Sequence, residues 1–213
     1  MSPLTRVLPI VVFSVSLTVP LRSARGEELC TPEYQPPSQP YTEEVYRCLS
    51  TVIFAINRGE SGNYQDLGDR LIRALLTNRE TPEVYRTTID PPWMQIAEVI
   101  AILDSQALVD LFVETIGAPH DGEETDQAYA QLYAWEAPKV LRSLSKYSDS
   151  DRAGRIDSLS WAIANFYWGH INLHNYKRVP IGPYWELLDH DNPLRPIAEE
   201  IEKSLVELGL PDK

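Results

Sequence analysis

The stretch that decides the fold runs from Trp93 to Ile116 and reads WMQIAEVIAILDSQALVDLFVETI. It is the most apolar segment after the first 26 residues, and its apolar side chains recur at helical steps. Asp90-Pro91-Pro92 predicts its start, because aspartate caps helices and proline is tolerated in the first turn. Gly117-Ala118-Pro119 predicts its end. Asp104-Ser105 either divides the stretch into two helices or lies within one, and the sequence leaves both open.

The same helical spacing extends outward in both directions along the chain. Thr42 is predicted to cap a first helix that stops at Gly59, and a turn over Gly59–Asn63 precedes an apolar stripe from Leu67 to Leu76. A loop is predicted over Gly117–Asp126, and a kink or new helix start at Pro138. Ser150 is predicted to cap a helix over Asp151–Asn175, and Asn192-Pro193 to open a last helix that ends at Gly209. Alternating β-branched runs are absent from the sequence. We therefore predict an all-α, single-domain irregular helical bundle of about six to eight helices.

Residues 1–26 have the order of a secretory signal peptide. Arg6 precedes an apolar run from Val7 to Val19, and small residues at Ala24 and Gly26 suit cleavage after Gly26. The run is shorter than the roughly 20 residues that span a bilayer, so an uncleaved anchor is the less favoured alternative. We expect a secreted or periplasmic protein, with no membrane span after cleavage, that consists of a Pro-rich extended arm over residues 27–41 and a helical domain over residues 42–213.

Cysteine occurs twice, as Cys30 in the arm and Cys48 in the first predicted helix. An isolated pair in an oxidising compartment usually forms a disulfide. The sequence has no Cys-x-x-Cys redox motif, so we predict a structural bridge that joins the arm to the helix.

The charge balance limits the possible partners. The formal net charge is −12, and removal of three leader arginines makes it 16 − 31 = −15. Such a chain repels phosphate backbones and anionic lipids, so nucleic acid is not expected as a partner. Another protein is expected, and the charge favours a basic one. The charge also suits simple solubility, and the oligomeric state is not predicted.

Three of the four histidines fall within 21 residues, at His170, His174 and His190. His170 and His174 lie one turn apart on a predicted helix, so both could bind one metal ion. The segment Asp189-His190-Asp191 could supply further ligands for a divalent transition metal. The favoured interpretation is that His170 and His174 are hydrogen-bonded core residues, with metal binding and a pH-responsive pair as alternatives.

Aromatic residues mark a second candidate region. Trp161, Ala164 and Trp168 form an apolar strip on a different side of the helix from the histidines, which suits a central helix or one that also meets a partner. Aromatic rings with polar tips serve both cores and binding surfaces. If any are exposed, we expect a binding cluster of Trp168, Tyr184 and Trp185 beside the acidic Asp189–Asp191 segment.

These features favour a protein-interaction module, such as an inhibitor or immunity-type protein that binds another cell-envelope protein. Nucleophile-elbow, phosphate-loop and dinucleotide motifs are absent from the sequence, so no catalytic residues or cofactor are predicted and enzyme activity is not favoured. Two alternatives remain: a metal-binding protein or metal-dependent enzyme that uses His170, His174 and Asp189–Asp191, and a small-ligand carrier with an aromatic cavity.

Overall fold

A computed structural model describes residues 30–78, 92–116, 123–173 and 189–209, although the side chains of residues 61, 123, 124 and 166–173 lie outside this description. The described residues form seven helices and no strand. The prediction of an all-α bundle is therefore confirmed. The helices are α1 (Glu43–Asn57), α2 (Ser61–Thr77), α3 (Trp93–Leu103), α4 (Gln106–Ile116), α5 (Glu123–Leu144), α6 (Asp149–Leu173) and α7 (Arg195–Glu207).

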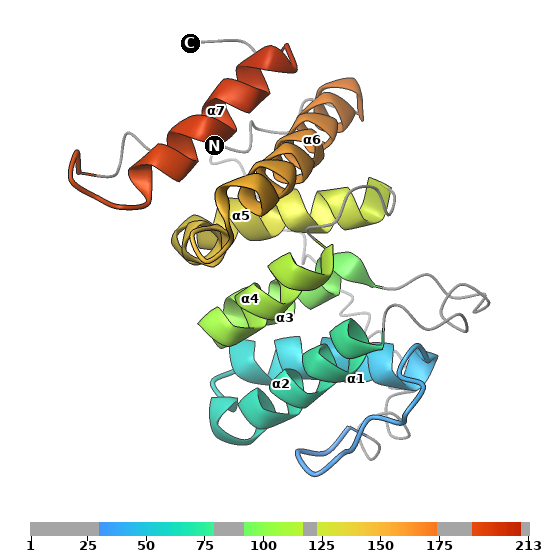
Figure 1. Ribbon diagram of the computed structural model, residues 1–213. Helices are drawn as coiled ribbons and strands as arrows, with labels where there is room; N and C mark the ends of the chain where they lie inside the picture. The colour runs from blue at the N-terminus through green and yellow to red at the C-terminus, as the bar shows by residue number, and fades with distance from the viewer. Residues whose placement is uncertain (1–29, 79–91, 117–122, 174–188, 210–213) are drawn as a thin grey trace, which may run out of the picture.

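The helices are stacked in chain order from one end of the molecule to the other (Figure 1). The pair α1 and α2 forms one end, α3 and α4 form the middle, and α5, α6 and α7 form the other end. Helix α5 packs against α3, α4 and α6, while α7 packs mainly on α6. Because most contacts join neighbours in the chain, each helix buries its apolar side against the next layer.

The apolar stretch over residues 93–116 is two helices. Asp104 separates them because its backbone is left-handed, with φ of 54°. Aspartate tolerates this conformation better than most residues do. Ser105 follows it, and its hydroxyl accepts a hydrogen bond from the Leu108 amide at 3.4 Å. The break at Asp104 turns the chain, so both halves of the stretch contribute to one core.

Helix α5 bends at the predicted place. Glu136 has non-helical backbone angles, two residues before Pro138. Proline removes a backbone donor and crowds the preceding turn, which is the physical reason for the kink. The two halves of α5 on either side of Glu136 therefore run in different directions.

Several helix boundaries differ from the sequence predictions. The prediction that Ser150 caps the long helix is wrong, because α6 starts at Asp149 and the Ser148 hydroxyl accepts from the Asp151 amide at 3.4 Å. The predicted turn and loop were also too long, since α2 already begins at Ser61 and α5 at Glu123. Segments of Gly, Ser and acidic residues favour both turns and first helical turns, which explains these shifts.

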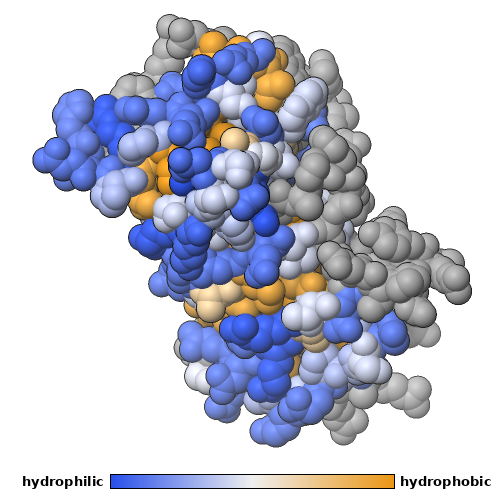
Figure 2. Space-filling view, viewed as in Figure 1, coloured by the Kyte–Doolittle hydropathy of each residue, from blue (hydrophilic) through white to orange (hydrophobic). Residues whose placement is uncertain are grey.

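One continuous core runs through the stack. Its largest fully buried side chains come from α1 to α5 and include Leu49, Leu71, Ile100, Phe112 and Tyr129. The space-filling view shows a mostly hydrophilic face (Figure 2). Apolar surface is visible at the level of α3 and α4, and again in the upper part where α5, α6 and α7 lie. Among the described residues, no helix is both long and apolar enough to cross a membrane.

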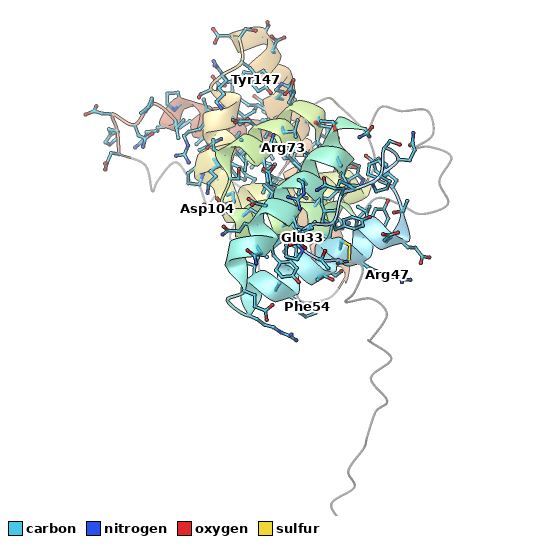
Figure 3. The ribbon with its side chains drawn as sticks, turned by 90° about the horizontal axis from the view of Figure 1, so that it is seen from below. Glu33, Arg47, Phe54, Arg73, Asp104 and Tyr147 are labelled. Carbon is cyan, nitrogen blue, oxygen red and sulfur yellow. A yellow bond between two sulfur atoms is a disulfide. The ribbon has the colours of Figure 1, made fainter. Side chains whose placement is uncertain are left out.

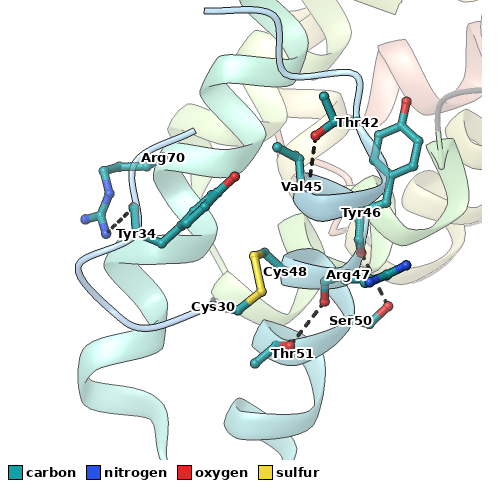
Figure 4. The surroundings of a disulfide bond; sticks show 10 residues. All are labelled: Cys30, Tyr34, Thr42, Val45, Tyr46, Arg47, Cys48, Ser50, Thr51 and Arg70. Atoms are coloured by element: carbon teal, nitrogen blue, oxygen red, sulfur yellow. Dashed lines mark hydrogen bonds between the residues drawn. A yellow bond between two sulfur atoms is a disulfide. The ribbon is translucent and has the colours of Figure 1, made fainter. Parts of the chain in front are cut away.

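A disulfide joins Cys30 to Cys48 of α1, with a Cα–Cα distance of 5.2 Å. The segment that carries Cys30 lies across α1 and α2 (Figure 4). Arg70 of α2 donates to the carbonyl oxygens of Pro32 and Tyr34, the latter at 3.4 Å. The bridge and these hydrogen bonds together hold residues 30–34 against the first layer.

Candidate functional site

The predicted metal ligands are only partly within the described structure. Asp189, His190 and Asp191 are exposed in the turn before α7. His170 falls within α6 but its side chain lies outside the described part, as does the whole of His174. Within the described ranges, no three side chains of the kinds that bind metals are grouped together. The metal hypothesis therefore gains no geometric support, and the histidine pair stays a prediction.

The predicted aromatic cluster has the same status. Trp168 lies in α6 without a described side chain, and Tyr184 and Trp185 lie outside the described residues. The structure does place other large apolar side chains at the surface. They are Phe54 of α1, Met94 of α3, Trp135 of α5, Trp161 of α6 and Val206 of α7.

Trp161 is the best candidate among them because of where α6 lies. This helix packs against both α5 and α7, so it buries two sides. Its side chains at Leu159, Ser160 and Ile163 are buried, and so is Ala164. Trp161 lies on the remaining outward stripe and is 50% exposed. The apolar strip predicted from the sequence is therefore divided, with Ala164 in the core and Trp161 at the surface.

A carboxylate lies one helical turn before Trp161, and an amide lies one helical turn after it. Asp157 precedes it by four residues and is exposed. Asn165 follows it by four residues, and its amide donates to the carboxylate of Asp126 in α5 at 3.1 Å. Residues four apart are neighbours on a helix surface. We call Asp126, Asp157, Trp161 and Asn165 the Trp161 face.

Two other exposed aromatic side chains have different surroundings. Trp135 is 46% exposed and lies at the α5 kink, next to Glu136, which is paired with Lys139. Phe54 is 64% exposed, and Arg58 follows it by one turn. Phe54 projects from α1 at the margin of the molecule, as the view from below shows (Figure 3). Isolated exposed apolar residues are normal on protein surfaces, so the acidic surroundings distinguish Trp161.

A cluster of charged side chains where α3 and α4 meet α5 is explained by packing. Lys139 binds both Asp104 and Glu136, and its hydrogen bond to Asp104 lowers the pKa of that carboxyl. Gln106 donates to the Lys139 carbonyl at 2.9 Å and accepts from Arg142 at 2.9 Å. These contacts link the Asp104 break to the α5 kink. Because the charged groups are paired with each other, the cluster stabilises the packing of α3 and α4 against α5.

Further polar contacts lie near the turn between α5 and α6. Burial favours the neutral form of Asp110, but hydrogen bonds from Lys146 and Gln106 outweigh it, and the pKa of this carboxyl is lowered. Beyond it, Arg155 of α6 donates to the Val113 carbonyl at 2.7 Å and lies 3.9 Å from the centre of the Tyr147 ring. These contacts fasten α4 to α6.

The aromatic rings described in the core are packed against other core residues. Phe112 and Tyr129 meet edge to face with ring centroids 6.0 Å apart. This is the usual geometry of a filled aromatic core. The carrier hypothesis required a roomy cavity lined by such rings, and this contact does not supply one.

The sequence-based prediction named Trp168, Tyr184 and Trp185, which stay a prediction, and it did not single out Trp161 as an exposed residue. The signal was the second apolar strip of α6, but spacing alone did not separate its exposed member from its buried one. No protein-family model, curated protein or solved structure matches this chain significantly. A functional assignment therefore depends on the chain's own side chains.

Proposed function

We propose that this protein is an exported, acidic helical module that binds another cell-envelope protein, in the manner of an inhibitor or immunity-type protein. The observation that carries the proposal is the exposure of half of the Trp161 side chain on the outer stripe of a helix that is otherwise buried on two sides. Tryptophan is enriched among the residues that contribute most to protein–protein binding.

The charge of the chain supports a basic partner. Its formal net charge is −12, and the exposed Asp157 lies one helical turn from the exposed tryptophan. Complementary charge speeds encounter and excludes wrong partners, while a buried aromatic anchor slows dissociation. An acidic surface around an aromatic side chain combines both effects.

Export is supported by the order of residues 1–26 and by the Cys30–Cys48 bridge. We expect the protein purified from its natural source to begin at residue 27 and to contain the oxidised cysteine pair. Intact-mass and peptide mass spectrometry measure both. A start at Met1 with two reduced thiols would contradict the export proposal.

Affinity capture tests the binding proposal directly. The oxidised, tagged protein is incubated with envelope extract and culture medium of the source organism, and captured proteins are identified by mass spectrometry. We expect one stoichiometric partner with a basic contact surface, confirmed by reciprocal capture with that partner as bait and by a measured Kd. Reduced protein serves as the control for the fold. Absence of any stoichiometric partner from both fractions would contradict the proposal.

A further inference from the structure

We infer that the Trp161 face binds an arginine side chain of the partner protein, with the guanidinium over the indole ring and hydrogen-bonded to the Asp157 carboxylate. This inference rests on the proposed function and names the chemistry that the surface recognises. It applies to Asp126, Asp157, Trp161 and Asn165 on the outward side of α5 and α6.

The indole supplies the first part of the site. Tryptophan attracts cations over its ring face more strongly than tyrosine or phenylalanine does. Trp161 is half exposed, so one side of its surface is available to a partner. A planar guanidinium stacks on an aromatic ring, whereas a lysine ammonium interacts as a strongly hydrated point charge. The aromatic component therefore favours arginine.

The carboxylates supply the second part. Asp157 is exposed on the same stripe as Trp161, and its carboxylate can accept two parallel hydrogen bonds from a guanidinium. Asp126 of α5 lies next to Asn165, whose amide donates to its carboxylate at 3.1 Å. The Asp157 carboxylate beside the indole, with Asp126 on the neighbouring helix, favours a cation and opposes an anionic partner. The hydrogen bond from Asn165 fixes the Asp126 carboxylate between α5 and α6.

Alternative occupants are less compatible with this arrangement. An isologous contact with a second copy of the chain would bring the acidic groups of both copies together. Like charges in contact are unfavourable, and the net charge of −12 adds to the repulsion. A purely apolar partner would bury the Asp157 carboxylate without supplying a charge to pair with it, at a desolvation cost.

The test uses nuclear magnetic resonance of the oxidised, ¹⁵N-labelled protein. The probe is a peptide of alternating arginine and glycine, and the control peptide has citrulline, which is uncharged, in place of arginine. The indole resonance of Trp161 is assigned with Trp161→Phe. We expect the arginine peptide to shift this resonance and the citrulline peptide to leave it unchanged. An unshifted Trp161 resonance at saturating arginine peptide would overturn the inference.

Three variants separate the site from general charge attraction. We expect Trp161→Ala to weaken binding of the arginine peptide about fivefold or more, and Asp157→Asn about threefold to fivefold. Glu200→Gln removes the same charge from an exposed position on α7, and we expect a change of less than twofold. Equal effects of Asp157→Asn and Glu200→Gln would overturn the site, because the attraction would then depend on net charge alone.

Capture of the natural partner by the variants distinguishes this inference from the proposed function. Loss of a captured partner in Trp161→Ala, with its retention by Glu200→Gln, supports the site. Retention of the partner by Trp161→Ala overturns the site and leaves the proposed function standing. Self-association in sedimentation experiments that Trp161→Ala abolishes would assign the face to a second copy and overturn the inference.

Discussion

Tyr41 and Tyr129 are both buried residues of the described core, and the surroundings of their hydroxyls are opposite. The Tyr41 hydroxyl donates to the Leu75 carbonyl at 2.7 Å and so joins the N-terminal segment to α2. The Tyr129 hydroxyl is fully buried in α5 without a hydrogen-bond partner among the described residues. Burial raises the pKa of Tyr129, because the ionised form would be poorly solvated there.

Phenylalanine substitutions at these two positions should therefore have opposite effects. We expect Tyr129→Phe to raise the free energy of unfolding by about 1 kcal/mol, because it removes a buried hydroxyl that lacks a partner. We expect Tyr41→Phe to lower it by about 1 kcal/mol, because it removes a satisfied buried hydrogen bond. Urea titration followed by circular dichroism measures both. A loss of stability in Tyr129→Phe similar to that in Tyr41→Phe would show that the Tyr129 hydroxyl has a partner.

The first three helices meet at a glycine. Gly68 of α2 is buried, and a Cβ added there would lie 3.0 Å from Leu103 Cδ1 and 3.1 Å from Val52 Cγ1. Both distances are shorter than ordinary van der Waals contact. The missing side chain therefore lets α1, α2 and α3 approach one another closely. In α6, by contrast, a Cβ at Gly154 meets no atom within 4 Å.

Alanine substitutions at Gly154 and Gly68 distinguish the effect of helix propensity on stability from the effect of close helix packing. We expect Gly154→Ala to raise the free energy of unfolding by up to about 1 kcal/mol, since glycine is a poor helix former. We expect Gly68→Ala to lower it by about 1 kcal/mol, because Val52 is fully buried and its β-branched side chain is stiff. The midpoints of thermal unfolding compare the two variants. An equal rise of the unfolding midpoint in both variants would mean that α1, α2 and α3 can move apart without a loss of stability.

In the whole molecule, the Cys30–Cys48 bridge fastens an irregular segment to one end of the stack. It closes a loop with a sequence separation of 18, which corresponds to about 3 kcal/mol in the chain-entropy estimate. Arg70 of α2 holds the same segment through the Pro32 and Tyr34 carbonyls. Part of the contact between this segment and α2 should therefore survive reduction of the disulfide.

We expect replacement of Cys30 and Cys48 by serine to lower the free energy of unfolding by about 3 kcal/mol. Urea titrations of the variant, the oxidised protein and the reduced protein provide the measurement. The reduced wild-type chain is the matched control and should unfold close to the variant. Identical midpoints for all three samples would show that the bridge does not constrain the unfolded chain.

Helical spacing, prolines and caps were sufficient to predict most elements of this protein. The Thr42 cap is confirmed, because its hydroxyl accepts from the Val45 amide at 3.3 Å. Gly59 ends α1 as predicted, with a positive φ of 83°. These signals are local, so they act through the nearest turns of the chain. The cap at Ser150 was wrong because Ser148 and Ser150 both suit the role and only the backbone geometry selects between them.

The sequence was sufficient to predict the all-helical class and the kink near Pro138, because both depend on local patterning. It was also sufficient to predict the disulfide, because the chain has only two cysteines. The tertiary structure decided which aromatic side chain reaches the surface. Ala164 and Trp161 belong to one apolar strip, yet α6 buries the first and exposes the second. Burial depends on how α5 and α7 pack against α6, and the spacing of residues along one helix does not contain that information.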